Sequence, residues 1–471
     1  MNPKGSKVNR KAGVHAVVIG GSLSGLFAAR VLSDHFGRVT VVDRDRFPDH
    51  AVQRKGVPQS HHIHVLLARG ARLYEQFFPS IGDDLTAVGA HALEWGYDNL
   101  LYTLGGWMPK VRTGYVSHMC SRELREFVVR QRVAALGNVR FLEERDAVGL
   151  QADDAKTKVI GVRTRLRGHA VGSEADGDGV MRVDLVVDAS GRSSRAPEWL
   201  QELGYVPPAE TNVNSFLGYA SRHYAPPPDF QAGWKALTLR GAPPYANRGG
   251  SVYPIEGDRW LVTLAGAGRD YPPLDDAGFL EFARTLGQPP LMYEALHEAT
   301  PLEPAVGYQR TDNRWRHYER LERQPENFVL VGDAACAFNP VYGQGMTIAA
   351  IDALALDECL RDAANTGSLA GMARRFQRAM AKGLAAPWLM ATSEDFRVPQ
   401  TEGAKPGRAT RVMHRYMDRV TMAASKNANV FRAFVDVTQL IKPPSALFSP
   451  AIVAQVLLQE GSRSALTMST K

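Results

Sequence analysis

Three glycine-marked segments carry residues that could hold a dinucleotide, although they lie far apart in the chain. They are residues 20–25 (GGSLSG), residues 188–194 (DASGRSS), and residues 332–345, which hold Gly332-Asp333 and Gly343-Gln344-Gly345. Each segment contains or follows an apolar run of the kind that forms a β-strand. Because glycine has no Cβ, it lets the backbone approach a phosphate or a flat ring closely. We therefore expect the three segments to meet in one pocket.

The first segment has the features of a strand-to-helix turn around a pyrophosphate. Residues 14–19 (VHAVVI) form a short apolar run, and apolar residues recur at helical spacing over 23–32. Such a turn places the free N–H groups and the positive dipole end of a helix against the phosphates. The expected cofactor residues here are Gly20, Ser22, Leu23, Ser24 and Gly25, with Ser22 in place of the middle glycine of the dinucleotide fingerprint.

A second predicted strand, residues 38–42, ends at Asp43. The carboxylate lies at about the 20-residue spacing at which such folds place an acceptor for a ribose hydroxyl. Asp43 and the adjacent Arg44 are therefore further candidates for cofactor binding.

The late segment also joins a strand to a helix. Residues 327–331 (NFVLV) lead into Gly332-Asp333, and a helical pattern begins shortly after Gly345. A helix N-terminus with free N–H groups would stabilise negative charge on a reduced flavin.

In this order and at these separations, the three segments resemble the signature of FAD-dependent monooxygenases with the hydroxybenzoate-hydroxylase fold. The resemblance implies that Asp333 holds the ribityl chain of FAD and that the Pro340 and Gly-x-Gly turn passes beside the flavin ring. The residues that it assigns to the cofactor in the middle and late segments are Asp188, Gly191, Gly332, Asp333, Pro340, Gly343, Gly345 and Met346.

Shorter stretches are similar to polyether-ionophore epoxidases of the monensin and lasalocid type, which oxidise polyenes. These stretches include residues 54–59 (RKGVPQ), 121–124 (SREL) and 252–257 (VYPIEG), and the similarity is collinear from about residue 14 to about residue 400. The resemblance adds Arg54, Gln59 and Arg122 to the expected cofactor site.

The middle segment bears on the electron source. Flavin hydroxylases that take hydride directly from NADPH tend to carry Asp-Gly at this point, whereas this chain has Asp188-Ala189-Ser190-Gly191. No second dinucleotide fingerprint follows a strand. Electrons could therefore come from NAD(P)H directly or through a partner reductase, and the sequence leaves both open.

His61, His62 and His64 offer at most three nitrogen ligands on a short loop, and no nearby Cys or carboxylate completes a metal set. We expect no metal site and interpret the loop as lying beside the cofactor. Cys120, Cys336 and Cys359 are widely spaced, as expected of free thiols in a reducing cytoplasm.

Composition excludes several other classes of protein. The 471 residues are 44% hydrophobic and 22% charged, which is ordinary for a globular enzyme, and the net charge of +7 is dispersed. No run approaches the roughly 18 apolar residues of a membrane span, and no nucleic-acid motif is present. The N-terminus has no apolar signal region, so the expected location is the cytoplasm.

The expected fold class is α/β, with a Rossmann-like FAD-binding domain, an inserted antiparallel sheet and C-terminal helices. The expected boundaries are 1–13 for a disordered basic lead-in, 14–70, 119–203 and 307–365 for the FAD domain, 71–118 and 204–306 for the substrate sheet, and 366–471 for the helices. The amphipathic stretches at residues 430–441 and 451–458 could cover the cavity, form a dimer contact or simply pack.

The predicted activity is monooxygenation of a lipophilic natural-product intermediate with O₂, and the favoured reaction is alkene epoxidation through a C4a-(hydro)peroxyflavin. Hydroxylation of an aromatic or quinone-like substrate, reduction of prenyl double bonds, and non-catalytic binding of a dinucleotide or lipid are the alternatives. No catalytic acid or base is expected, because the cofactor carries the hard chemistry. The candidate pocket residues are Trp95, Tyr97, Phe216, Tyr219, Tyr253, Trp260 and Phe338.

Overall fold

A parallel sheet of five strands forms the centre of the cofactor-binding half. The computed structural model describes residues 11–168, 179–287, 289–404 and 407–458. The expected lead-in falls mainly on residues 1–10, which lie outside the described residues. The sheet order is β20-β11-β1-β2-β7. These strands are β1 (Gly13–Ile19), β2 (Phe36–Val42), β7 (Val139–Leu142), β11 (Leu185–Asp188) and β20 (Phe328–Leu330).

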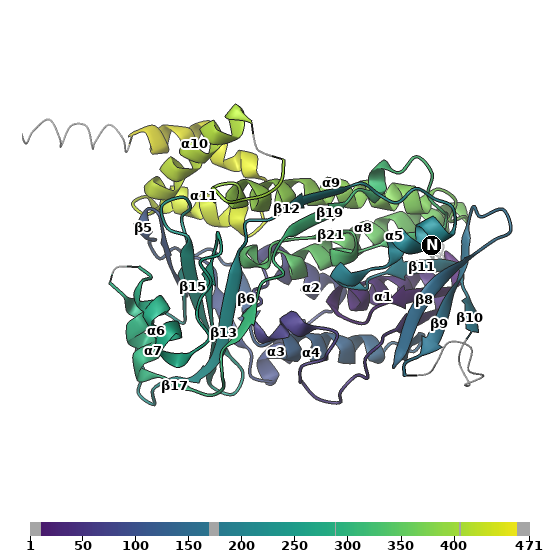
Figure 1. The fold of residues 1–471 in the computed structure, drawn as a ribbon, viewed down its shortest axis with the longest axis horizontal. Coiled ribbons are helices and arrows are strands. Elements are labelled where there is room, and N and C mark those ends of the chain that lie inside the picture. Colours follow the sequence, from purple (N-terminus) through teal and green to yellow (C-terminus); the bar gives the residue numbers. More distant parts are fainter. Residues whose placement is uncertain (1–10, 169–178, 288, 405–406, 459–471) are drawn as a thin grey trace, which may run out of the picture.

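Helices pack around this sheet and bury its apolar faces. They are α1 (Leu23–His35), α2 (Ala68–Phe77), α3 (Ile81–Ala87), α4 (Arg122–Ala134) and α8 (Gly345–Thr366). Helix α1 lies beside α8 and α4 (Figure 1). Residues 16–19 of β1 and 185–187 of β11 are buried, continuous apolar runs because both faces of the sheet are covered, as in other parallel sheets. This arrangement fixes the carboxyl ends of β1, β11 and β20 side by side.

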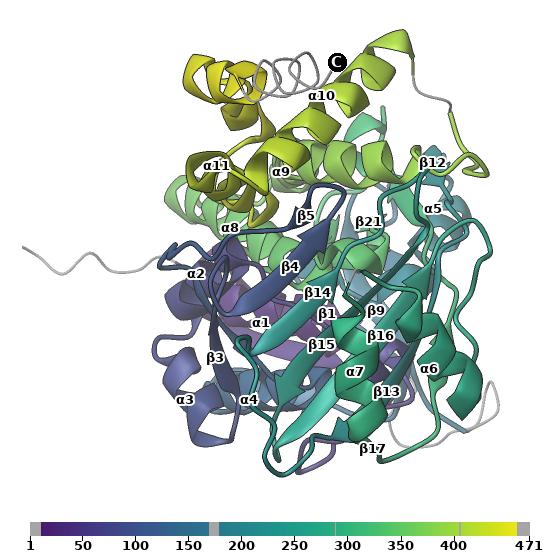
Figure 2. The same cartoon turned by 90° about the vertical axis from the view of Figure 1, so that its left-hand side faces the viewer.

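A second, mainly antiparallel sheet lies at the other end of the molecule (Figure 2). Its eight strands run in the order β17-β13-β16-β15-β14-β4-β5, with β18 also paired to β13. They are β4 (Asn99–Thr103), β5 (Gly106–Trp107), β13 (Gly218–Ala225), β14 (Ala236–Leu239), β15 (Arg248–Ile255), β16 (Arg259–Gly266), β17 (Thr300–Pro301) and β18 (Val306–Tyr308). Helices α6 (Asp276–Arg284) and α7 (Leu291–Glu298) contribute to a core on one face.

Smaller elements complete the fold. A three-stranded sheet holds β8 (Arg145–Ala152), β9 (Val159–Leu166) and β10 (Gly179–Arg182), and another holds β12 (Glu210–Val213), β19 (Asn313–Arg316) and β21 (Cys336–Ala337). Strands β3 (His91–Glu94) and β6 (Val116–Met119) form a pair, and α5 (Ala196–Glu202) follows the middle glycine segment.

The C-terminal part of the described chain is helical, as the pattern predicts. Its helices are α9 (Met372–Asp395), α10 (Arg408–Ala424) and α11 (Ala428–Thr438). A second core joins them to the sheet half, through Phe431 and Phe434 of α11 on one side and Trp95 and Tyr253 on the other. The helices therefore close over one face of the sheet rather than forming a separate unit.

The mixed α/β architecture, with its Rossmann-like sheet, added antiparallel sheets and C-terminal helices, confirms the predicted fold class. No helix among the described residues is long and apolar enough to cross a membrane.

Candidate functional site

The three glycine segments meet at the carboxyl ends of β1, β11 and β20. A Cβ added to Gly20 would lie 2.6 Å from the carbonyl oxygen of Ala189, in the middle segment. A Cβ added to Gly332 would lie 2.3 Å from Ser24 Oγ. Both glycines also have positive φ, at 101° and 58°. Only glycine fits these close approaches, so the three segments pack directly against one another. We call their junction the crevice.

The N-terminus of α1 opens into this crevice. Ser22 is the residue before the helix, and its side chain does not cap the helix N–H groups. Its hydroxyl instead donates to Glu126 Oε2 at 2.8 Å. A Cβ on Gly25 would lie 1.8 Å from the Gly20 carbonyl oxygen, so the first turn of α1 packs tightly against the loop that precedes it. The uncapped N–H groups and the helix dipole favour an anion at this position.

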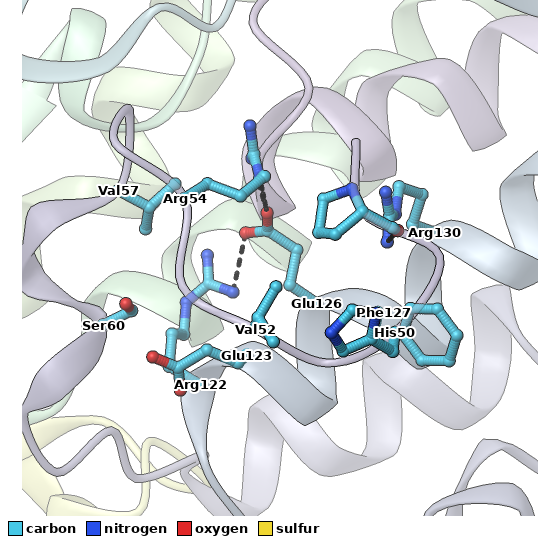
Figure 3. Close-up of a pocket in the computed structure, with 11 residues that line it drawn as sticks. His50, Val52, Arg54, Val57, Ser60, Arg122, Glu123, Glu126, Phe127 and Arg130 are labelled. Carbon is cyan, nitrogen blue, oxygen red and sulfur yellow. Dashed lines mark hydrogen bonds and ion pairs between the residues drawn. The ribbon is translucent and has the colours of Figure 1, made fainter. Parts of the chain in front are cut away.

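A buried ionic cluster borders the first segment. Figure 3 shows the carboxylate of Glu126 between the guanidinium groups of Arg54 and Arg122. The ion-pair distances are 2.5 Å to Arg54 and 2.8 Å to Arg122, and Arg122 Nη2 donates to Ser22 Oγ at 2.9 Å. Burial works against the charged form of Glu126, but Arg122 and Arg54 together lower the pKa of this carboxyl. The cluster thus holds two cations beside the phosphate end of the crevice.

Asp43 and Asp188 are buried at the same sheet edge, with their oxygens engaged. Asp43 accepts from the N–H groups of Gly21 at 2.6 Å and Asp45 at 2.8 Å. Asp188 accepts from Ser190 N–H and from the hydroxyls of Ser190 and Ser194. Both carboxylates therefore order the turns that form the crevice. Burial raises the pKa of each. The side chain of Arg44 is exposed, and Gln59 is half-buried.

The part of the crevice around Asp333 is the expected position of the flavin, and we call it the flavin end. The side chain of Asp333 is 42% exposed, and its Oδ2 lies 3.8 Å from Arg192 Nε. Helix α8 begins at Gly345 without a side-chain cap, and a Cβ on Gly345 would meet no atom within 4 Å. Burial raises the pKa of Asp352 to about 7, although it accepts from Gly332 N–H at 2.9 Å. An exposed carboxylate, an uncapped helix and open space are therefore adjacent. Met346, in the first turn of α8, is buried.

A large cavity lies next to the flavin end. Its volume is about 600 Å³, and it is lined by β13 to β16, the loop 340–344, and helices α9, α10 and α11. Pro340 and Gly343, which were expected beside the flavin ring, both line it. The loop that is expected to border the flavin ring is therefore a wall of the cavity. Figure 2 shows α9, α10 and α11 stacked against the edge of the sheet half.

The wall between crevice and cavity is aromatic. Tyr219 stacks on Tyr308, with ring centroids 5.6 Å apart, and the ring of His62 meets Tyr219 edge-on at 4.8 Å. Burial raises the pKa of both tyrosines. The charge of Arg192 lowers these two pKa values and the charge of Asp333 raises them, but burial has the larger effect. Burial also lowers the pKa of His62 to about 3, so this side chain is neutral at physiological pH.

The far wall of the cavity carries charged groups that are paired with each other. Arg397 Nη1 lies 2.7 Å from Asp418, and Arg397 Nε lies 3.2 Å from Glu394. Arg240 lies 3.5 Å from Glu394. Asp395 accepts from the Tyr342 hydroxyl at 2.7 Å, and burial raises the pKa of this carboxyl to about 6. The charged groups of the far wall are thus engaged with one another, and most of the remaining lining is apolar.

Among the predicted pocket residues, Trp95, Tyr219 and Tyr253 line the cavity. Tyr97, Phe216, Trp260 and Phe338 do not. Trp260 packs on Phe230 in the core on the opposite sheet face, at a centroid distance of 4.7 Å. Phe338 packs against Trp388, Arg269 lies over the ring of Phe216, and Arg112 lies over the ring of Tyr97. Strand β13 starts only at Gly218, so Phe216, with φ at 49°, precedes the strand.

Several site residues were not among the sequence candidates. Glu126 lies four residues after Arg122 on the predicted helix, a spacing that signals a helical ion pair. Arg192 follows Gly191 directly in the middle segment. Tyr308 and the cavity-lining residues of α9 to α11 carry no comparable local signal.

The residues present fit FAD. The crevice offers uncapped helix N-termini to a pyrophosphate and a flavin edge, two arginines near the first, and a partly exposed Asp333 near the second. Among the described residues there is no group of three or more His, Cys, Asp or Glu side chains arranged to hold a metal ion.

The sequence of a mycobacterial protein decides the family. Protein Rv3254 of Mycobacterium tuberculosis is 34% identical over 380 residues, which cover 80% of this chain and 79% of the relative. This chain belongs to the same family as Protein Rv3254. No protein-family model matches the chain.

Solved structures establish the fold of this family member as that of FAD-dependent monooxygenases and halogenases. The p-nitrophenol 4-monooxygenase PnpA of Pseudomonas putida DLL-E4 has a TM-score of 0.63 at 17% identity, covering 91% of this chain and 98% of PnpA. A triple mutant of the flavin-dependent brominase Bmp2 has a TM-score of 0.64 at 14% identity, covering 95% and 99%. A 72-residue stretch, 15% of the chain, is 43% identical to 14% of the kynurenine 3-monooxygenase of Salinispora tropica. The predicted enzyme class, a FAD-dependent monooxygenase, agrees with these neighbours.

Proposed function

We propose that this protein uses FAD to insert one oxygen atom of O₂ into a lipophilic substrate, and that the reaction is alkene epoxidation. The observation that carries the proposal is the shared wall. The loop 340–344, expected beside the flavin ring, also lines the apolar cavity of about 600 Å³. A substrate in the cavity would therefore lie against the flavin. The polyene epoxidase resemblance of residues 54–59 points to the same substrate class.

Bound and reduced FAD supplies the oxygen chemistry, in which two electrons and two protons turn the second oxygen atom of O₂ into water. The protein residues bind, orient and exclude water. Trp95, Tyr219 and Tyr253 give the cavity an aromatic lining, and a dry site suppresses side reactions with water. Burial raises the pKa of Tyr253 to about 12, so its hydroxyl stays neutral.

The charge state of the cavity favours an alkene over an ionised aromatic substrate. His62, Tyr219 and Tyr253 are neutral at physiological pH. Arg397 and Arg240, the cations on the far wall, are already paired with carboxylates. No cation is thus left on these two walls, within the described residues, to bind a substrate carboxylate or phenolate. An alkene is uncharged, so it needs no cation in the cavity to bind it.

His62 has a specific part in this proposal. Its Nδ1 lies 2.8 Å from Ser221 Oγ, and Ser221 Oγ lies 2.6 Å from Thr263 Oγ1, which accepts from Ile63 N–H. Each hydroxyl hydrogen finds an acceptor if Thr263 donates to Ser221 and Ser221 donates to Nδ1. The ring proton then sits on Nε2, which has no partner among the described residues. We infer that this N–H donates to an oxygen or nitrogen of the cofactor or substrate.

The proposal also includes the source of the electrons. Electrons come from NAD(P)H, either directly or through a reductase. Rapid anaerobic bleaching of the flavin by NADPH alone would establish the direct route, and bleaching only after addition of a reductase would establish the indirect one.

Oxygen labelling tests the reaction. FAD-loaded protein is reduced and mixed with ¹⁸O₂ and, separately, with a linear polyene, a phenol and a prenylated lipid. We expect one ¹⁸O atom in an epoxide of the polyene. Label in the phenol alone would assign aromatic hydroxylation, and oxygen-independent saturation of the prenyl chain would assign a reductase.

A further inference from the structure

Helix α10 separates the cavity from solvent. Ala409, Met413, Met417 and Thr421 recur every four residues, and all four line the cavity. This face of the helix is therefore the lid of the substrate space. In Figures 1 and 2, α10 lies at the outer edge of the molecule, so its opposite face looks outward.

The outward face carries a stripe of arginines. Arg408, Arg411, Arg415 and Arg419 follow one another at spacings of three and four residues, and all four are exposed. Such spacing places them along one side of the helix, over a length of roughly 16 Å. Arg408, Arg411 and Arg415 form no ion pair with any described residue. Asp418 is the single acidic residue of α10, and it is paired with Arg397.

Exposed apolar side chains border this stripe. Val412, which lies between Arg411 and Arg415 in the sequence of α10, is 66% exposed. Leu389 of α9, Met413 and Phe448 are 60%, 40% and 39% exposed, and these three also line the cavity. Side chains that contact both cavity and solvent mark the mouth. The mouth thus opens beside the arginines, with an apolar rim.

We propose that the outward face of α10 docks on an anionic lipid bilayer and that the mouth takes lipophilic substrate from it. This proposal rests on the proposed function, because it assumes that the substrate is lipophilic. Basic residues beside exposed apolar ones are the composition that binds an interface, through lipid charge and shallow burial. An acidic protein partner would match the arginines but would leave the apolar rim without a role. In this proposal α10 lies on the surface of the bilayer and does not cross it.

Vesicle binding tests the docking surface. FAD-loaded protein is sedimented with vesicles of phosphatidylcholine alone or mixed with phosphatidylglycerol. The double variant Arg411→Gln/Arg415→Gln is compared with Arg140→Gln/Arg182→Gln, which removes two exposed arginines from β7 and β10. Strand β10 lies at the opposite end of the molecule from α10 (Figure 1). A third variant, Val412→Ser, removes an exposed apolar contact without changing charge.

We expect binding to the anionic vesicles, weakened about 25-fold in the α10 double variant, at roughly fivefold for each arginine. The control pair should bind like the wild type, and Val412→Ser should weaken binding less. No binding to anionic vesicles, or equal loss in the control pair, would overturn the proposal. So would loss of affinity for an acidic electron-transfer protein in the α10 variant without any vesicle binding. The flavin spectrum and the ¹⁸O₂ assay of the same samples report separately on the proposed function.

Discussion

The cofactor crevice and the cavity beside it are built in opposite ways. The crevice is made of short segments in which glycines, serines and charged residues contact each other at fixed distances, such as Gly25 against the Gly20 carbonyl. The cavity is made of faces from β13 to β16 and α9 to α11, which are far apart in the sequence, from Gly218 at the start of β13 to Thr438 at the end of α11. The crevice has fixed close contacts at particular positions, such as Gly20 and Gly25, whereas the cavity depends on overall shape.

This difference implies that the two regions respond separately to substitution. Changes in the crevice should affect FAD binding or folding, and changes on the α10 side of the cavity should affect the substrate alone. Substitutions on the wall that the two regions share, such as His62 and Tyr219, should affect folding or the flavin as well. Four predictions test that separation, beginning with the largest effect.

Gly25→Ala should abolish FAD binding and lower the free energy of unfolding by about 3 kcal/mol. The added Cβ would lie 1.8 Å from the Gly20 carbonyl oxygen, and overpacked sites typically lose this much. Denaturant unfolding and quenching of FAD fluorescence measure both effects. Gly137→Ala is the control, because a Cβ there meets no atom within 4 Å. Wild-type behaviour of Gly25→Ala would contradict the packing of α1 on its turn.

Asp333→Ala should weaken FAD binding by one to two decades and leave the apo fold intact. A hydrogen bond to a charged group contributes roughly 1.5–3 kcal/mol. Asp312→Ala serves as the matched control, since Asp312 also pairs with Arg192 at 3.2 Å. FAD titration by fluorescence separates the two variants. Equal affinities would place the ribityl chain elsewhere.

His62→Gln should remove about 2 kcal/mol of pH dependence from the stability between pH 7 and pH 5. The folded pKa of His62, about 3, lies below the ordinary value of 6.5, so only the unfolded chain takes up this proton in that range. Its contribution is therefore fully present above pH 6.5 and is lost as the pH falls toward 3.

Urea unfolding at the two pH values measures this difference between wild type and variant. His50→Gln, which alters an exposed histidine, should keep the wild-type dependence. If His62→Gln kept it as well, the ring would be solvated rather than buried against Tyr219.

Ala409→Trp should raise the substrate KM about tenfold, which corresponds to about 1.4 kcal/mol, without changing FAD affinity. The new side chain would enter the cavity from the lid face of α10. Ala385→Trp on α9 is the control, because Ala385 is exposed and does not line the cavity. Steady-state kinetics with the substrate found by oxygen labelling measure the change, and an unchanged KM would place the substrate elsewhere.

The same contrast explains what the sequence could predict. The glycine segments are local patterns, so the amino-acid sequence alone places Gly20, Gly25, Gly332 and Gly345 at strand-to-helix turns. The convergence of the segments follows from parallel strands that end at one sheet edge.

The cavity has no such local signature. Trp260 and Tyr253 occur close together on paired strands and are both aromatic, yet Trp260 packs in the core on one sheet face and Tyr253 lines the cavity. Strand register decides the face that each side chain occupies, because residues alternate along a strand. The contribution of the C-terminal helices depends on tertiary packing, so the amphipathic pattern of residues 430–441 and 451–458 alone left a lid, a dimer contact and plain packing open.

The most direct test of the cofactor assignment is a titration of the apo protein with FAD, followed by the absorbance spectrum of the complex. We predict saturable binding of a single FAD per chain and a flavin spectrum that changes when Tyr219 is replaced by Phe. Failure of the folded protein to bind FAD would contradict the assignment of the three glycine segments to one cofactor crevice.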